Sequence, residues 1–165
     1  PKGSDGTPMT LIRVEGFEAS VSYRAGQLQT LLAGAHETSV ETSAKAIAAQ
    51  WSNIGNVEPF HGRSGNVWRI SVKPSDAPKL AQQLQADDLL LDWGGGLVWA
   101  LMPDGVDLRA RLDGIAGHAT LIRANIQDRT EISVFHPEPQ PLATLAAGLR
   151  AQFDPRAILN PGLMG

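Results

Sequence analysis

Histidine is the residue type of this 165-residue chain best suited to acid–base or metal chemistry, and the chain has four: His36, His61, His118 and His136. Imidazole titrates near pH 7 and is a common metal ligand. The four share no ligand spacing such as i,i+4, and there is no cysteine to complete a zinc site. We therefore predict no metal site and interpret the histidines as surface or hydrogen-bonded residues.

His118 is the best acid–base candidate, because it follows Gly117 at the start of an expected strand and its neutral form could accept a proton near pH 7. The sequence offers no partner residue for it. A strand-end histidine bonded to the backbone is therefore the favoured alternative.

Two glycine-containing segments resemble catalytic motifs only superficially. Residues 94–96 are three glycines, but they join two expected strands, whereas a phosphate loop leads from a strand into a helix. Residues 62–65 lack the glycine spacing of a nucleophile elbow. We interpret the first as a hairpin turn and the second as an ordinary loop.

Composition limits the class of protein. The length of the chain predicts one domain. The chain has no run of about 18 apolar residues, the length that a membrane-spanning helix needs. It also lacks the cysteines that disulfides or iron–sulfur clusters need. Its 14 basic and 17 acidic residues give a net charge of -3, and scattered arginines predict no nucleic-acid partner. Residues 1–8 have neither an initiator Met nor a signal sequence, which predicts a linker or disordered lead and a mid-chain start.

Apolar periodicity predicts the elements that would position these residues. Thr38 and Glu41 have capping-box spacing before an apolar stripe that contains Trp51. The element order favours an α+β fold, a ferredoxin-like sandwich with a mixed or antiparallel sheet, helices mainly on one face and a C-terminal tail helix. The expected strands are 9–14, 67–72, 89–93, 97–101 and 118–124, and the expected helices are 21–32, 38–54, 75–84, 106–116 and 142–153.

Four sequence blocks carry a family resemblance: VWRISV at 67–72, LDWGG at 91–95, GHAT at 117–120 and FDPRAILNPG at 153–162. In order and spacing they resemble the FAD-binding subunit of bacterial glycolate oxidase, a vanillyl-alcohol-oxidase-type FAD-linked oxidase. Two positions depart from the family pattern. Leu163 replaces the basic residue that usually follows Asn-Pro-Gly, and Ala116 replaces a glycine before the GHAT block.

The resemblance covers the C-terminal cap region and implies a division of the chain. Residues 1–8 are then the lead, 9–136 the cap or substrate domain, and 137–165 the C-terminal helix and flavin-facing tail. It implies Asn160 as a cofactor contact and His118 and Arg69 as substrate-pocket candidates, with catalytic residues unassigned. FAD is expected to be held mainly by an N-terminal domain, because this chain has no pyrophosphate loop of its own.

The resemblance also implies a function: FAD-dependent oxidation of glycolate, a small 2-hydroxy acid, to glyoxylate. Its implied partners are the N-terminal FAD-binding domain of the same subunit, a homologous flavin subunit and an iron–sulfur subunit. The implied location is cytoplasmic, with peripheral attachment to the inner face of the membrane through those subunits. One alternative is a non-catalytic, ferredoxin-like interaction module. A small-molecule sensor, which would enclose a pocket within the chain, is another.

Overall fold

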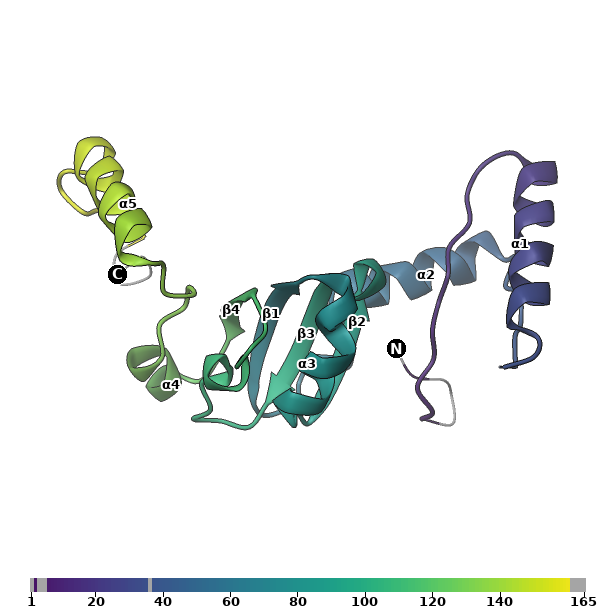
Figure 1. Cartoon of the computed structure of the whole chain (residues 1–165), viewed down its shortest axis with the longest axis horizontal. Helices are drawn as coiled ribbons and strands as arrows, with labels where there is room; N and C mark the ends of the chain where they lie inside the picture. The colour runs from purple at the N-terminus through teal and green to yellow at the C-terminus, as the bar shows by residue number, and fades with distance from the viewer. Residues whose placement is uncertain (1, 3–5, 36, 161–165) are drawn as a thin grey trace. The chain divides into compact units, whose positions relative to one another are not determined.

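The computed structural model describes residues 2, 6–35 and 37–160 (Figure 1). The chain divides into two compact units, an N-terminal unit of residues 1–59 and a sheet unit of residues 60–165. The prediction of a lead, a cap domain and a tail stays a prediction.

The N-terminal unit contains two helices, α1 (Glu18–Leu32) and α2 (Ala44–Gly55). The predicted apolar face of α1 is its more shielded face, yet the helix buries none of its residues. At the start of α2, the Ser43 hydroxyl accepts a hydrogen bond from the Ala46 N–H at 3.3 Å. The predicted capping box at Thr38 is therefore wrong, because Ser43 directly precedes the first helical turn and satisfies its free N–H. Trp51, expected in the buried stripe, is only half-buried.

Residues 9–14, predicted as a strand, have no regular secondary structure. Alternating polarity forms a strand only where a neighbouring strand completes the hydrogen-bond ladder. Among the described residues near this segment, the pairing is limited to an isolated bridge between Lys2 and Pro8. The strand prediction for residues 9–14 is wrong because it rested on the alternating pattern alone, and the segment has no partner strand.

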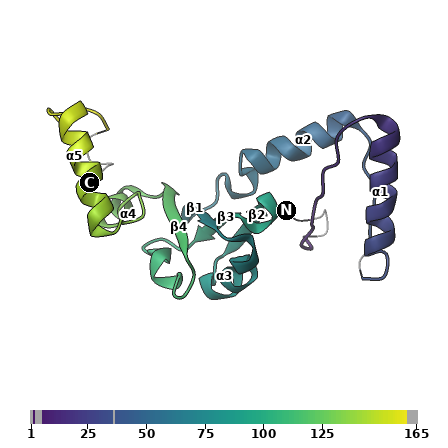
Figure 2. The same cartoon turned by 45° about the horizontal axis from the view of Figure 1, so that its top comes forward.

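The sheet unit is built on four antiparallel strands in the order β2-β3-β1-β4. The strands are β1 (Asn66–Val72), β2 (Asp88–Asp92), β3 (Leu97–Met102) and β4 (Gly117–Arg123), and helix α3 (Ala77–Leu84) connects β1 to β2. Figure 2 shows α3 lying against one face of the sheet. This strand order is that of a ferredoxin-like fold, with a 3₁₀ turn where the second helix of that fold would lie, and it confirms the predicted α+β class.

The core lies between one face of the sheet and α3. Trp68 and Ile70 of β1 are fully buried there, and Leu80 and Leu84 of α3 pack against the same cluster. Burial of one such side chain contributes about 1.5–3 kcal/mol, so this layer fixes the orientation of β1. The opposite face of β1 is thereby left for Arg69 and its neighbours.

The helix predicted over 106–116 is only a 3₁₀ turn, Leu108–Arg111. Its apolar residues Leu108, Leu112 and Ile115 are buried as expected. However, Gly114 adopts a φ of +67°, which helical geometry does not allow. The periodicity found the right inward-facing residues but the wrong backbone.

Two further helices follow the sheet. Helix α4 (Ile126–Glu131) was not predicted, because its six residues are too few to show a period, although the Asn125 side chain caps it by accepting the Asp128 N–H at 2.8 Å. Helix α5 (Gln140–Phe153) confirms the last predicted helix, and none of its residues is buried.

Candidate functional site

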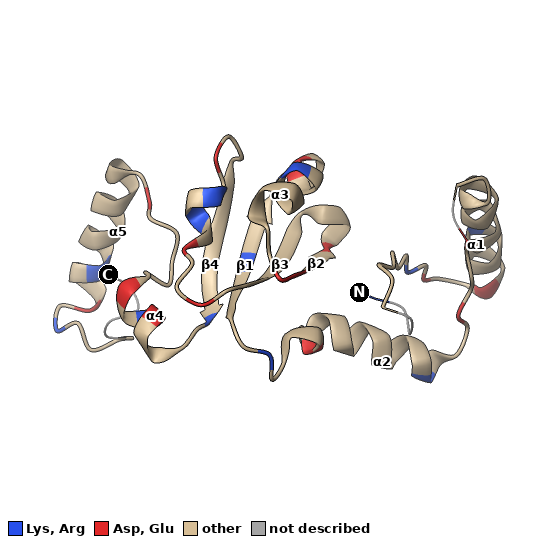
Figure 3. Cartoon of the chain, turned by 90° about the horizontal axis from the view of Figure 1, so that it is seen from below, with Lys and Arg blue, Asp and Glu red and all other residues tan. Residues whose placement is uncertain are grey.

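The face of the sheet opposite the core brings two of the predicted site residues together. Side chains alternate along a strand, so Arg69 and Ser71 point away from the buried Trp68, Ile70 and Val72. In the strand register, Arg69 lies opposite Thr120 and Ser71 lies opposite His118. Arg69 and His118 are therefore diagonal neighbours on one face, which we call the open face. Figure 3 shows a basic (blue) segment within β1. The sequence of this strand, NVWRISV, contains one basic residue, Arg69.

Aromatic residues surround Arg69 on this face. Trp99 of β3 is its cross-strand neighbour, and the guanidinium carbon of Arg69 lies 5.8 Å from the ring centroid of Trp93. Trp93 is 66% exposed and has a φ of +52°, and the Asp92 carboxylate accepts its N–H at 2.7 Å. The stacked ring restricts the guanidinium while its N–H groups remain available for an anion.

The glycines after Trp93 form the turn between β2 and β3, which confirms the hairpin interpretation. Gly95 has a φ of +99°, and a Cβ added to it would lie 3.0 Å from the Cβ of Ala77 on α3. Glycine is needed here for a positive φ and for close approach to a helix. The triplet positions Trp93 rather than a phosphate.

His118 is exposed and has a histidine partner that sequence reasoning missed. The ring centroids of His118 and His136 are 5.4 Å apart. His136 Nδ1 accepts a hydrogen bond from the Ala119 N–H at 3.3 Å, so its neutral form carries the proton on Nε2. Partial burial lowers the pKa of His136, and the positive charges of His118 and Arg109 lower it further. No local pattern in the sequence relates two residues that a loop brings together.

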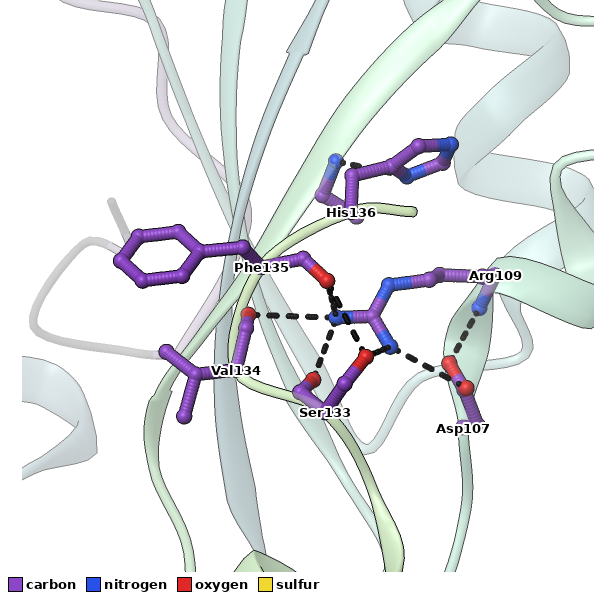
Figure 4. Close-up of polar contacts among 7 residues, drawn as sticks. Asp107, Arg109, Ser133, Val134, Phe135 and His136 are labelled. Carbon is purple, nitrogen blue, oxygen red and sulfur yellow. Dashed lines mark hydrogen bonds and ion pairs between the residues drawn. The ribbon is translucent and has the colours of Figure 1, made fainter. Parts of the chain in front are cut away.

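Arg109 organises the chain that carries His136 (Figure 4). Its Nη2 donates to the carbonyl oxygens of Ser133, Val134 and Phe135 at 2.6, 3.1 and 3.0 Å. Nη1 forms an ion pair with Asp107 at 3.2 Å, and the guanidinium lies 4.8 Å from the ring centroid of Trp68. The side chain is only 9% exposed. Arg109 is thus a structural cation that fixes three consecutive carbonyl groups.

Asn160, the predicted cofactor contact, lies in a turn after α5 that Asp154 builds. The two carboxylate oxygens of Asp154 accept the N–H groups of Ile158 and Leu159 at 3.0 and 2.9 Å. Asn160 is exposed, with a φ of +48° that asparagine tolerates better than most residues. Residues 161–165, which complete the Asn-Pro-Gly signature, lie outside the described residues.

The described residues do not fit the pyrophosphate of FAD. The two connections from a strand to an α-helix, residues 73–76 and 124–125, contain no glycine, and the glycine triplet at 94–96 joins β2 to β3 instead of leading into a helix. The same described part of the chain contains no group of three or more His, Cys, Asp or Glu side chains that could hold a metal ion. Nor does it contain a helix long and apolar enough to span a membrane.

Comparison with known proteins gives a partial match. No family model matches the chain, and no solved structure matches it. Glycolate oxidase subunit GlcE of Escherichia coli (strain K12) is 34% identical over 158 residues, which cover 93% of this chain. The chain spans only 38% of the length of that relative. The similarity agrees with the family that the four sequence blocks predicted. Over nearly its whole length, the chain is therefore similar to one part of the glycolate oxidase subunit GlcE.

Proposed function

We propose that this chain forms the cap region of a glycolate oxidase FAD-binding subunit, and that the whole complex oxidises glycolate to glyoxylate. The observation that carries the proposal is the similarity to GlcE over 93% of the chain. The open face supports it, because a half-buried arginine and an exposed histidine lie there as diagonal neighbours on adjacent strands. The flavin would supply the redox chemistry, and the N-terminal domain of the same subunit would hold it.

Arg69 is the residue that we expect to bind the substrate carboxylate. A guanidinium forms two parallel hydrogen bonds with a carboxylate, and such charge-assisted bonds are stronger than neutral ones. The Trp93 ring and the neighbouring strands limit its rotamers, which lowers the entropy cost of binding. His118 and the hydroxyl groups of Ser71 and Thr120 are close enough in register to contact the rest of a small 2-hydroxy acid.

The N-terminal flavin domain is the partner that best explains the apolar surface of α5. Leu145, Leu149 and Phe153 follow one another at helical spacing and are 64%, 56% and 78% exposed. A contiguous apolar surface of this kind is typical of an interface. Asn160 follows the same helix and would face the flavin domain. A homologous flavin subunit and an iron–sulfur subunit complete the proposed complex, which would be cytoplasmic and peripheral on the inner face of the membrane.

The alternative function is a non-catalytic interaction module. Exposed apolar residues on α1 and directly before it favour it independently of α5, since Phe17 is 91% exposed, Tyr23 68% and Leu31 78%. The two functions predict different roles for the open face. An interaction module needs no arginine aligned beside a histidine, whereas a substrate cap does.

An Arg69 substitution distinguishes them. We define hybrid GlcE as the E. coli subunit in which the matched segment is replaced by this chain. In a hybrid GlcE complex, Arg69→Gln should raise KM for glycolate about 10- to 100-fold, because one charge-assisted contact is lost. Steady-state glycolate oxidation with an artificial electron acceptor measures this.

Arg129→Gln is the control, since Arg129 is an arginine that lies on α4 instead of the open face, where it is exposed. This control should keep the unmodified KM. If Arg69→Gln and the control give the same KM, Arg69 does not bind substrate. Circular dichroism of both variants shows whether the fold is retained.

A further inference from the structure

We propose that residues 132–136, here called the strap, form a pH-sensitive latch on the outer edge of β4. One end of the strap is fixed permanently by Arg109, and the other end is released when His136 gains a proton. This inference does not depend on the proposed function, because neither glycolate nor flavin takes part in it.

The strap satisfies hydrogen-bond donors at an edge of the sheet that has no further strand. β4 pairs with β1 on one side. On its other side, the Leu121 N–H donates to the Val134 carbonyl at 2.9 Å and the Ala119 N–H donates to His136 Nδ1 at 3.3 Å. Alternate N–H groups of a strand point to the same side, so these two contacts form one short edge.

The two contacts differ in their response to pH. The Leu121 contact uses the Val134 carbonyl oxygen, which also accepts a hydrogen bond from Arg109, and arginine keeps its charge at every pH at which proteins fold. The Ala119 contact needs an unprotonated Nδ1. Once His136 is protonated, both ring nitrogens carry protons and the Ala119 N–H faces another donor.

The charges around His136 favour its neutral form. Facing it are the His118 ring on β4, the Arg109 guanidinium and the Asp107 carboxylate. Burial, His118 and Arg109 lower the pKa of His136, whereas Asp107 raises it. The pKa of histidine is ordinarily about 6.5, so the latch should stay closed at neutral pH and open only below that value.

Amide hydrogen exchange of the 165-residue chain, followed by NMR between about pH 7.5 and pH 4.5, tests the latch. After correction for intrinsic exchange and normalisation to the buried Ile70 amide, Ala119 protection should fall about 10-fold or more below pH 6. Leu121 protection should stay constant. In His136→Gln, where a neutral amide oxygen replaces Nδ1, Ala119 protection should not depend on pH.

Two further variants make the test decisive. His118→Gln should move the Ala119 transition to higher pH by removing the neighbouring cation, and His61→Gln should leave it unchanged. A constant Ala119 protection in the unmodified chain would overturn the latch, and so would an identical transition in His136→Gln. Simultaneous loss of amide protection at Ala119 and Leu121 would contradict the proposal that Arg109 holds its end of the strap at every pH. If His136→Gln does not fold, an unshifted transition in His118→Gln overturns the proposal.

Discussion

At the scale of single residues, two glycines shortly before β1 adopt a positive φ but differ in the space around them. Gly65 precedes β1 with a φ of +103°, and a Cβ there would lie 2.5 Å from the carbonyl oxygen of Met102 on β3. Gly62 also has a positive φ, +69°, but has nothing within 4 Å of an added Cβ. These two glycines separate the effect of a steric clash from that of backbone conformation.

Gly65→Ala should therefore lower the free energy of unfolding by about 3 kcal/mol or more, because conformational strain and a clash with backbone add together. Gly62→Ala should cost only about 1–2 kcal/mol, the strain of a left-handed alanine. Urea denaturation of both variants measures the difference. Equal losses would show that the β1–β3 pairing at this end is loose enough to move.

Asp128 predicts a pH dependence of stability. Its carboxylate is buried and accepts hydrogen bonds from the Gly105 N–H at 2.8 Å and the Asn66 amide at 2.7 Å. These bonds, the Gly105 contact foremost, hold the pKa of Asp128 below its ordinary value of 3.8. The unfolded chain therefore binds this proton at a higher pH than the folded chain does. The stabilisation is present above about pH 4 and is lost as the pH falls below it.

Melting temperatures measured from pH 6 to pH 2.5 test this expectation. Asp128→Asn should lower the melting temperature at pH 6 and should flatten its decrease in acid relative to the unmodified chain. Asp104→Asn, on the adjacent exposed turn, provides the control and should retain the full decrease. An unchanged acid decrease in Asp128→Asn would assign the effect to other carboxylates.

At the scale of elements, sequence periodicity predicted the sheet strands and most helices, because each has apolar residues at the spacing of one face. It failed for residues 9–14, which lack a partner strand, and for 106–116, where Gly114 interrupts the helix. It also predicted that Trp51 is buried. Trp51 is half-buried beside Arg13, with 5.8 Å between guanidinium carbon and ring centroid, whereas Trp68 is fully buried.

The candidate site was predictable only in part. Alternation along β1 and β4 is enough to predict on which side of its own strand Arg69 or His118 lies. The strand register then places both residues on the same face of the sheet. The partnership of His136 with Arg109 and β4 depends on residues 132–136, which return to the outer edge of β4, and no local rule encodes such a contact. Whether Asn160 contacts a cofactor stays a prediction.

The apolar surface of α5 gives a prediction at the element scale. Because Leu145 is 64% exposed, Leu145→Gln should change the free energy of unfolding of the isolated chain by less than about 0.5 kcal/mol. Leu80→Ala, in the buried face of α3, should cost about 2–5 kcal/mol. In hybrid GlcE, Leu145→Gln should reduce the amount of bound flavin, measured by absorbance after purification. Unchanged flavin content would show that α5 does not contact the flavin domain.

At the scale of the whole molecule, we propose that different parts of one subunit shape the substrate site and hold the cofactor. The described residues provide a rigid sheet with an aligned arginine and histidine, but no loop for the FAD pyrophosphate. The relative is longer than this chain, which spans 38% of it. We therefore expect the chain to shape a site whose cofactor is held by other parts of the subunit.

The most direct test of this account is glycolate oxidation by hybrid GlcE assembled with its E. coli partner subunits. The control is a hybrid that carries an unrelated ferredoxin-like domain in place of the same segment. The account predicts that the hybrid with this chain holds flavin and reduces an artificial acceptor in a glycolate-dependent reaction, and that the control hybrid does not. A hybrid with this chain that holds flavin and assembles, yet fails to oxidise glycolate, would contradict it.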